Sequence, residues 1–252
     1  MTVYWADDTV TLHHGDMRDI LPALVNAGLR ADCALVDPPY NETKLTWDRW
    51  PDGWPAFVAA ATSSMWCFGS MRMFLTRHAE FAGWQMSQDI VWEKHNGSGF
   101  HADRFRRVHE HALHWYRGPW AGIHHQAPTT ADATARTVRR KTRPPHMGET
   151  KDSAYTSVDG GPRLMRSVIN VRSMHGRAIN GTEKPVGVLT PLIEYACPSG
   201  GLVLDPMAGS GSTAEAARAT GRRTVLIEGD EEACEAIARR LSQGVLTAGW
   251  PA

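Results

Sequence analysis

The apolar run Cys33–Val36 ends in the tetrapeptide Asp37-Pro38-Pro39-Tyr40, whose side chains could take part in chemistry. An aspartate at the end of a buried strand presents a carboxylate that accepts hydrogen bonds. Two consecutive prolines have a fixed φ and no N–H, so they hold their carbonyl oxygens in place. The ring of Tyr40 offers a flat face for stacking. An ordinary turn aspartate that binds local backbone groups is the alternative.

A second chemistry-bearing segment is 201–230, GLVLDPMAGSGSTAEAARATGRRTVLIEGD. An apolar strand runs into Asp205, a loop with Gly209 and Gly211 follows, and an alanine-rich helix leads to a strand that ends at Glu228. Glycines let backbone N–H groups approach a ligand closely, and a helix N-terminus favours an anion. The acid at the end of the next strand can accept hydrogen bonds from ribose hydroxyls. The segment predicts a nucleoside-binding unit, with a simple tight turn as the alternative.

The glycine loop alone leaves two kinds of cofactor open. GSGSTA at 209–214 fits the dinucleotide pattern G-x-G-x-x-A, and Glu228 lies about 20 residues on, as a nicotinamide-dependent dehydrogenase requires. However, the carboxylate of Asp205 would repel a pyrophosphate, and the loop lies near the end of the sequence, where we expect no second mononucleotide-binding half. A ligand with an adenosine, a positive centre and one carboxylate fits better, which favours S-adenosylmethionine.

These two segments need a scaffold that places them together, and the pattern of the terminal thirds predicts one. Short β-like runs alternate there with helix-like runs, which is typical of a parallel, doubly wound α/β sheet. The expected strands are 9–13, 33–36, 64–68, 88–92, 112–116, 202–204 and 224–227. The expected helices are 17–27, 54–61, 71–82, 188–196, 212–220 and 231–241. Ligands of such sheets bind at the carboxyl ends of the strands, so we expect Asp37 and the glycine loop at neighbouring strand ends.

The segment 118–180 interrupts this alternation and is rich in Thr, Arg, Pro, Gly and His. We interpret it as an insertion between two halves of one domain, 1–117 and 181–252. The range from Thr129 to Asn180 contains ten Lys or Arg residues and only four acidic residues, although the formal net charge of the chain is zero. A local basic segment indicates a polyanionic partner. The candidate phosphate contacts are Arg136, Arg139, Arg140, Lys141 and Arg143, with a solvated loop as the alternative.

Composition excludes several classes of protein. Of the 252 residues, 42% are hydrophobic, which is enough for one large core. No run approaches the ~18 consecutive apolar residues of a membrane span, and the first residues lack the pattern of a secretory signal. The four scattered cysteines indicate buried free thiols, so we expect a soluble, cytoplasmic protein. The 12 histidines do not follow the spacing of a zinc site, and we expect no metal.

Together, the two motifs resemble those of the amino-group DNA methyltransferases, which methylate N6 of adenine or N4 of cytosine. DPPY at 37–40 is similar to their catalytic signature, and LDPMAGSGST at 204–213 is similar to their cofactor loop. Other similar stretches are LHHGDMRDILP, DIVWEKHNGSG, RFRRVHEHALHWYRG and GTEKPVGVLTPLIEYA. The catalytic motif precedes the variable region and the cofactor loop, which is the order of the family's β group, whose members are often dimeric.

The resemblance implies a Rossmann-like methyltransferase sheet with a target-recognition region at 118–180, a double-stranded DNA partner and a homodimer. It implies that Asp16 lies near the adenine of S-adenosylmethionine and that Thr182 and Lys184 lie near its methionine end. The remaining implied cofactor contacts are Asp205, Met207, Ala208, Gly209, Ser210, Gly211, Ser212, Thr213 and Glu228. The family commonly has Phe where this chain has Met207, and methionine can fill the same apolar space.

The implied chemistry explains the tetrapeptide. An exocyclic amine is a poor nucleophile because its lone pair is delocalised into the base. Asp37 would accept one of its N–H groups and the carbonyl of Pro38 the other, and both bonds strengthen as nitrogen becomes positive. Tyr40 would stack on the flipped base, and the tryptophans that follow, Trp47, Trp50 and Trp54, would line a DNA cleft or belong to the core.

The aspartate in the tetrapeptide favours adenine N6, because cytosine-N4 members of the family more often carry Ser there. The sequence therefore predicts an adenine-N6 DNA methyltransferase. The alternatives are a cytosine-N4 methyltransferase, the dehydrogenase and a non-catalytic DNA-binding protein.

Overall fold

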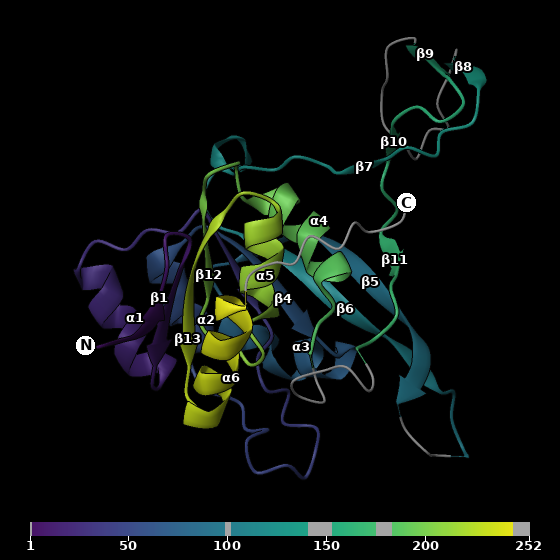
Figure 1. Ribbon diagram of the computed structural model, residues 1–252. Helices are drawn as coiled ribbons and strands as arrows, with labels where there is room; N and C mark the ends of the chain where they lie inside the picture. The colour runs from purple at the N-terminus through teal and green to yellow at the C-terminus, as the bar shows by residue number, and fades with distance from the viewer. Residues whose placement is uncertain (1, 99–101, 141–152, 175–182, 244–252) are drawn as a thin grey trace. The chain divides into compact units, whose positions relative to one another are not determined.

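A mixed β-sheet is the centre of the larger of two structural units. The computed structural model describes residues 2–98, 102–140, 153–174 and 183–243. Unit 1 comprises Met1–Gln126 and Ser167–Ala252, and unit 2 comprises Ala127–Arg166. Within the described residues, the sheet of unit 1 has nine strands in the order β1-β2-β13-β12-β3-β4-β6-β5-β11 (Figure 1).

The strands of this sheet run in both directions. They are β1 (Val3–Ala6), β2 (Val10–His14), β3 (Cys33–Val36), β4 (Ser64–Gly69), β5 (Gln85–Ser98), β6 (Arg107–Tyr116), β11 (Val168–Asn170), β12 (Leu202–Asp205) and β13 (Arg223–Glu228). The five central strands, β2, β13, β12, β3 and β4, run parallel to one another. By contrast, β6 is antiparallel to both β4 and β5, and β1 is antiparallel to β2.

The expectation of an entirely parallel sheet is therefore wrong for the runs 88–92 and 112–116. These runs belong to β5 and β6, which form one long hairpin. Alternating burial specifies which side chains face the core, but it does not specify strand direction. The connection from Ser98 to Arg107 is too short for the crossover of a dozen or more residues that a parallel pair requires.

In the part of the chain that the structure describes, three α-helices pack on each face of the sheet. Helices α1 (Met17–Asn26), α2 (Trp54–Ala61) and α3 (Met71–Arg77) share one core cluster with Ala34 and Val36 of β3. The alternate residues Cys33 and Leu35 pack in another cluster with α4 (Val186–Ala196) and α5 (Ser212–Ala219). Helix α6 (Glu231–Ser242) packs beside α5 in a third cluster (Figure 1). Alternate residues of one strand thus pack against helices on opposite faces of the sheet, which is the doubly wound arrangement expected from the sequence.

Local side chains fix where these helices begin. Asp16, Ser70 and Asp230 precede α1, α3 and α6, and each side chain accepts a hydrogen bond from a backbone N–H of the first turn. The expected helix 71–82 is interrupted, because its second part, His78–Phe81, forms the 3₁₀ helix η1.

Unit 2 consists of short antiparallel pairs. Strand β7 (Thr129–Thr130) pairs with β10 (Arg163–Leu164), and β8 (Arg136–Arg140) pairs with β9 (Ser153–Ser157). The unit is shorter than the expected insertion 118–180. The residues after it return to unit 1, where β11 adds a parallel edge strand beside Val91–Glu93 of β5.

Three findings bear on the class of protein. Within the described ranges, no helix is both long enough and apolar enough to cross a membrane. Cys33, Cys67, Cys197 and Cys234 are free and buried, as their apolar surroundings in the sequence predict. The same ranges contain no group of three His, Cys, Asp or Glu side chains placed to hold a metal ion.

Candidate active site

The carboxyl ends of four adjacent parallel strands bring predicted site residues to one edge of the sheet. Strand β12 pairs in parallel with both β3 and β13, and β13 pairs with β2. Asp37 directly follows β3, Asp205 and Glu228 end β12 and β13, and Asp16 comes two residues after β2. The fold thus brings these four carboxylates, distant in sequence, to neighbouring strand ends.

Asp37 is held by two side chains and remains partly open to solvent. Its side chain is 29% exposed. The hydroxyl of Tyr40 donates to Asp37 Oδ1 at 2.9 Å, and the ammonium of Lys184 contacts Oδ2. Burial raises the pKa of Asp37 and the charge of Glu110 adds to this rise, whereas Lys184 and Tyr40 oppose it. Lys184 therefore lies against the predicted catalytic carboxylate, from a segment 147 residues away in sequence.

Two further charged residues, Glu110 and Lys94, extend this contact and were missed as functional residues. Glu110 Oε2 lies 3.4 Å from Lys184 Nζ, and its Oε1 accepts a hydrogen bond from Lys94. Burial acts to raise the pKa of Glu110, but the two ammonium groups outweigh it and hold that pKa at about 2. Burial also acts to lower the pKa of Lys184, but Asp37 and Glu110 raise it overall. An available signal was the strand period, which puts Glu110 on the same face as buried Ala112.

The loop after the tetrapeptide is closed by Asp48, another residue that sequence reasoning missed. Its buried carboxylate accepts backbone N–H bonds from Asn41, Glu42 and Thr43 at 2.7, 2.9 and 2.6 Å. Asn41 has a φ of 56°, a left-handed conformation that asparagine tolerates better than most residues. Asp48 therefore fixes the path by which the chain leaves Tyr40.

The tryptophans of this region have different surroundings. Trp54 is fully buried and Trp50 nearly so, and both belong to the core cluster with α1 and α3. The interpretation of Trp50 and Trp54 as the lining of a DNA cleft is therefore wrong, and these two residues belong to the hydrophobic core. Trp47 is 54% exposed.

The glycine loop is held by Glu228. Its Oε2 accepts the N–H of Gly209 at 2.7 Å, and its Oε1 accepts the N–H of Asp230 at 2.9 Å. Gly209 and Gly211 have φ values of 54° and 75°. A Cβ at Gly211 would also lie 3.0 Å from the side chain of Ile237, so this position requires glycine for both its backbone conformation and its packing.

Asp205 is a buried carboxyl group beneath this loop. Its Oδ1 accepts the N–H of Met207 at 3.1 Å. Burial raises the pKa of Asp205 to about 7, while the hydroxyl of Thr213 and the N–H of Met207 oppose the rise. The other predicted loop residues, Ala208, Ser210 and Ser212, are also buried.

The remaining predicted cofactor residues are Asp16 and Thr182. Asp16 caps α1 and forms an ion pair with Arg18, which lowers its pKa. Thr182 lies outside the described residues.

A fourth missed residue, Arg240 of α6, contacts the glycine loop. Its guanidinium donates to Glu183 Oε1 at 2.8 Å and to the carbonyl of Ser210 at 3.2 Å, and it contacts Glu215 of α5. Only 14% of the Arg240 side chain is exposed. The guanidinium thus joins the loop to the segment that carries Lys184.

The predicted DNA contacts lie in unit 2. Arg136 and Arg139 are on β8, and Arg136 is exposed. Lys141, Arg143 and the side chain of Arg140 lie outside the described residues.

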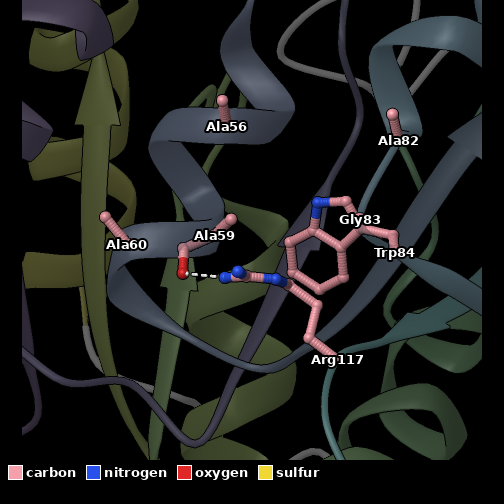
Figure 2. Close-up of a pocket in the computed structure, with 7 residues that line it drawn as sticks. All are labelled: Ala56, Ala59, Ala60, Ala82, Gly83, Trp84 and Arg117. Atoms are coloured by element: carbon pink, nitrogen blue, oxygen red, sulfur yellow. Dashed lines mark hydrogen bonds between the residues drawn. The ribbon is translucent and has the colours of Figure 1, made fainter.

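Two shallow cavities lie away from the carboxylate edge, on the outer side of α2. One, of about 390 Å³, is lined mainly by small residues and by Trp84 and Arg117 (Figure 2). Arg117 donates to the carbonyl of Ala59 at 2.6 Å, so its guanidinium is already engaged. The other, of about 340 Å³, lies between α1 and α2. Neither includes a predicted site residue.

Curated proteins similar to the chain include methylases. The putative methylase YubD of Escherichia coli (strain K12) is 34% identical over 116 residues, which make up 42% of this chain. The chain spans 51% of the length of that protein. The type II methyltransferase M.HinfI of Haemophilus influenzae is 23% identical over 267 residues, which cover 92% of this chain and 68% of that protein.

Solved structures of methyltransferases share the fold. The crystal structure of the M1.HpyAVI–SAM complex matches with a TM-score of 0.63 and 22% identity, over 92% of this chain and 99% of that one. The PvuII DNA methyltransferase, which is cytosine-N4-specific, matches with a TM-score of 0.61 and 11% identity, over 99% of this chain and 90% of that one. The doubly wound sheet is thus the Rossmann-like sheet of methyltransferases.

A family model described as DNA methylase, of the N6/N4 type, matches residues 31–239. This range contains the tetrapeptide, Glu110, Lys184, the glycine loop and Glu228. The match covers most of the chain and both motifs on which the resemblance rests. The chain therefore belongs to the N6/N4 DNA methylase family.

Proposed function

We propose that the chain is an S-adenosylmethionine-dependent methyltransferase that acts on N6 of an adenine flipped out of double-stranded DNA. The observation that carries the proposal is the pairing of β3 with β12. Asp37 follows one strand, and the glycine loop follows the other. A base amine hydrogen-bonded to Asp37 would thus lie near a cofactor held by the loop. The family match favours this reading over a dehydrogenase.

The residues present suit S-adenosylmethionine. Gly209 and Gly211 have the left-handed φ values that give the loop its tight turn, and Glu228 is an acceptor at the end of the next strand, where burial raises its pKa. The raised pKa of Asp205 also fits, because the positive groups of such a ligand would stabilise its ionised form. We assign the remaining loop residues, with Asp16, Thr182 and Lys184, to the same cofactor.

The chain's own groups can activate a weak nucleophile. Bound S-adenosylmethionine would supply an activated methyl group. Asp37 would accept one N–H of the amine and the carbonyl of Pro38 the other, and Pro39 keeps a further donor away from it. These bonds strengthen as the nitrogen becomes tetrahedral and positive, so they stabilise the transition state more than the ground state. The Asp37 carboxylate also faces the proton that the nitrogen then releases. Tyr40 would stack on the flipped base.

The target base is tested by chemistry on the product. Purified protein is incubated with labelled S-adenosylmethionine and plasmid DNA, and the modified nucleoside is identified after digestion. We expect N6-methyladenine. Cytosine N4 is the second candidate, since the PvuII enzyme shares the fold. Label found only in N4-methylcytosine would refute the adenine assignment, and no label in any nucleoside would refute the methyltransferase itself.

The basic residues Arg136, Arg139, Arg140, Lys141 and Arg143 are proposed to contact DNA phosphates. Changing Arg136 and Arg139 to Gln should reduce the slope of log affinity against log salt concentration by about 1.8, because each neutralised phosphate contributes about 0.9. Fluorescence anisotropy with a labelled duplex measures this slope. Arg239→Gln, which changes an exposed arginine of α6, is the control. An unchanged slope in the double variant would assign these arginines to solvent. The homodimer and the cytoplasmic location stay predictions.

A further inference from the structure

Four charged side chains form a row that ends at the predicted catalytic carboxylate: Lys94, Glu110, Lys184 and Asp37. We call it the charge row. Each member contacts the next, and positive and negative charges alternate along it. The side chains of Lys94, Glu110 and Lys184 are 17%, 11% and 8% exposed. The charges of the two ammonium groups and the two carboxylates add to zero. Charged groups are buried at acceptable cost only when they are paired in this way.

Glu110 is the centre of the row. It lies on β6 opposite Trp92 of β5, and Lys94 comes two residues further along β5, with its Nζ 4.6 Å from the centre of the Trp92 ring. The hairpin therefore fixes one oxygen of Glu110 on Lys94. The other oxygen points to Lys184, and the contacts among the described residues connect Glu110 to Asp37 through that lysine.

Lys184 is enclosed by groups that direct its ammonium. Its Nζ lies 5.2 Å from the Phe68 ring centre and 5.9 Å from the Tyr40 ring centre, with carboxylates on the remaining sides. An ammonium has three donors, and one of them can serve each carboxylate. If Glu110 were neutral, the charge of Lys184 would act on Asp37 alone. A carboxylate fully compensated by one cation is a weaker acceptor for a second donor.

We propose that Glu110 is a positioning residue of the methyl-transfer site: it shares the Lys184 ammonium, so that Asp37 keeps enough negative charge to accept the hydrogen bond of the target amine. This inference rests on the proposed function. It assigns a task in the reaction to a strand residue outside both sequence motifs.

The charges around Asp37 predict the direction in which its pKa changes when a neighbouring charge is removed. The groups that act on Asp37 are Lys184, Glu110 and Tyr40, and it also interacts with Cys67 of β4 and Asp205 of β12. The negative charge of Glu110 raises the pKa of Asp37, and the positive charge of Lys184 lowers it. Removing the charge of Glu110 should therefore lower that pKa. Removing Lys94 should raise it, because Glu110 would then attract Lys184 more strongly.

The test compares Glu110→Gln with Lys94→Gln, two substitutions that remove opposite charges next to each other. Single-turnover methylation is measured against pH with DNA and cofactor saturating. For Glu110→Gln we expect the plateau of the pH–rate profile to be about tenfold lower, which corresponds to 1.36 kcal/mol. We also expect the acidic side of that profile to move to lower pH. For Lys94→Gln we expect the acidic side of the profile to move to higher pH. Binding of S-adenosylhomocysteine, measured by calorimetry, should remain detectable in both, since the glycine loop and Glu228 are unchanged.

A readout that needs no substrate separates this inference from the proposed function. The carboxyl carbon of Asp37 is followed by NMR in aspartate-labelled protein and assigned by its loss in Asp37→Asn. Its titration should move in the same two directions. If the pKa of Asp37 shifts in the same direction in both variants, or if its titration and the methylation rates are unchanged, the role of Glu110 is overturned. This holds even if the variants are less stable than the wild type. A wild-type protein that methylates no DNA, with the two opposite shifts present, would overturn the proposed function and leave the electrostatic coupling standing.

Discussion

Asp37→Ala will lower the rate of methyl transfer by about 10²- to 10³-fold, the usual effect of removing one group that stabilises developing charge. The reason is that the amine then loses the acceptor that strengthens its interaction as the nitrogen becomes positive. Binding of S-adenosylhomocysteine should persist, because Glu228 and the glycine loop are unchanged. Radiolabel transfer in single turnover measures the rate, and calorimetry measures the binding.

Asp32→Ala is the matched control for this variant. Asp32 lies directly before β3, at the opposite end from Asp37, and its carboxylate accepts the N–H of Leu202 at 2.7 Å. The substitution Asp32→Ala removes a carboxylate and a hydrogen bond from the same sheet, but it leaves the residues at the carboxyl ends of the strands unchanged. We expect near-normal transfer from Asp32→Ala. If Asp37→Ala keeps more than about a tenth of the wild-type rate, a non-catalytic role for the tetrapeptide becomes the better explanation.

Arg240→Met should give the largest loss of stability. The guanidinium contacts two carboxylates and the carbonyl of Ser210, and breaking such a buried pair costs about 3–5 kcal/mol. For a chain of this size, each kcal/mol lowers Tm by about 2–4 °C. Urea unfolding followed by circular dichroism measures the free energy of unfolding.

The neighbouring arginine provides the control. Arg239 has a side chain that is 71% exposed, and among the described residues it forms one distant ion pair, with Glu235 at 3.8 Å. Arg239→Met changes the net charge and the helix composition equally, and it should cost no more than about 0.5 kcal/mol. Equal losses in the two variants would show that the contacts of Arg240 add nothing to the stability of the loop.

Local features of the fold could be predicted from the sequence because they depend on local rules. The strand Cys33–Val36 and the helix Trp54–Ala61 have the predicted bounds. All four residues of the strand are buried, and Pro55 lies in the first turn of the helix, where proline is favoured. The position of Asp37 beside the glycine loop followed from the rule that parallel strands present their carboxyl ends at one edge.

Other features depend on contacts between distant segments. The hairpin of β5 and β6 was not predicted, because an apolar run has no intrinsic direction. The strand period could mark Glu110 as facing the core, but only the placement of β6 near the segment that carries Lys184 shows that it belongs to the site. Arg240 similarly acts across 57 residues, on Glu183. Charged residues on a strand or helix usually face solvent, so the residue types of Glu110 and Arg240 alone indicated exposed positions.

The order of the sheet has a consequence for how the chain folds as it is synthesised. Strands β2 and β3 follow one another in sequence, but β13 and β12 separate them in the sheet. Until the ribosome has released residues up to Glu228, the early strands can form only two disconnected fragments, each with an unpaired edge. Such edges promote association between chains. Nascent chains that stop before residue 202 should therefore depend on chaperones or aggregate, whatever the state of their active-site residues.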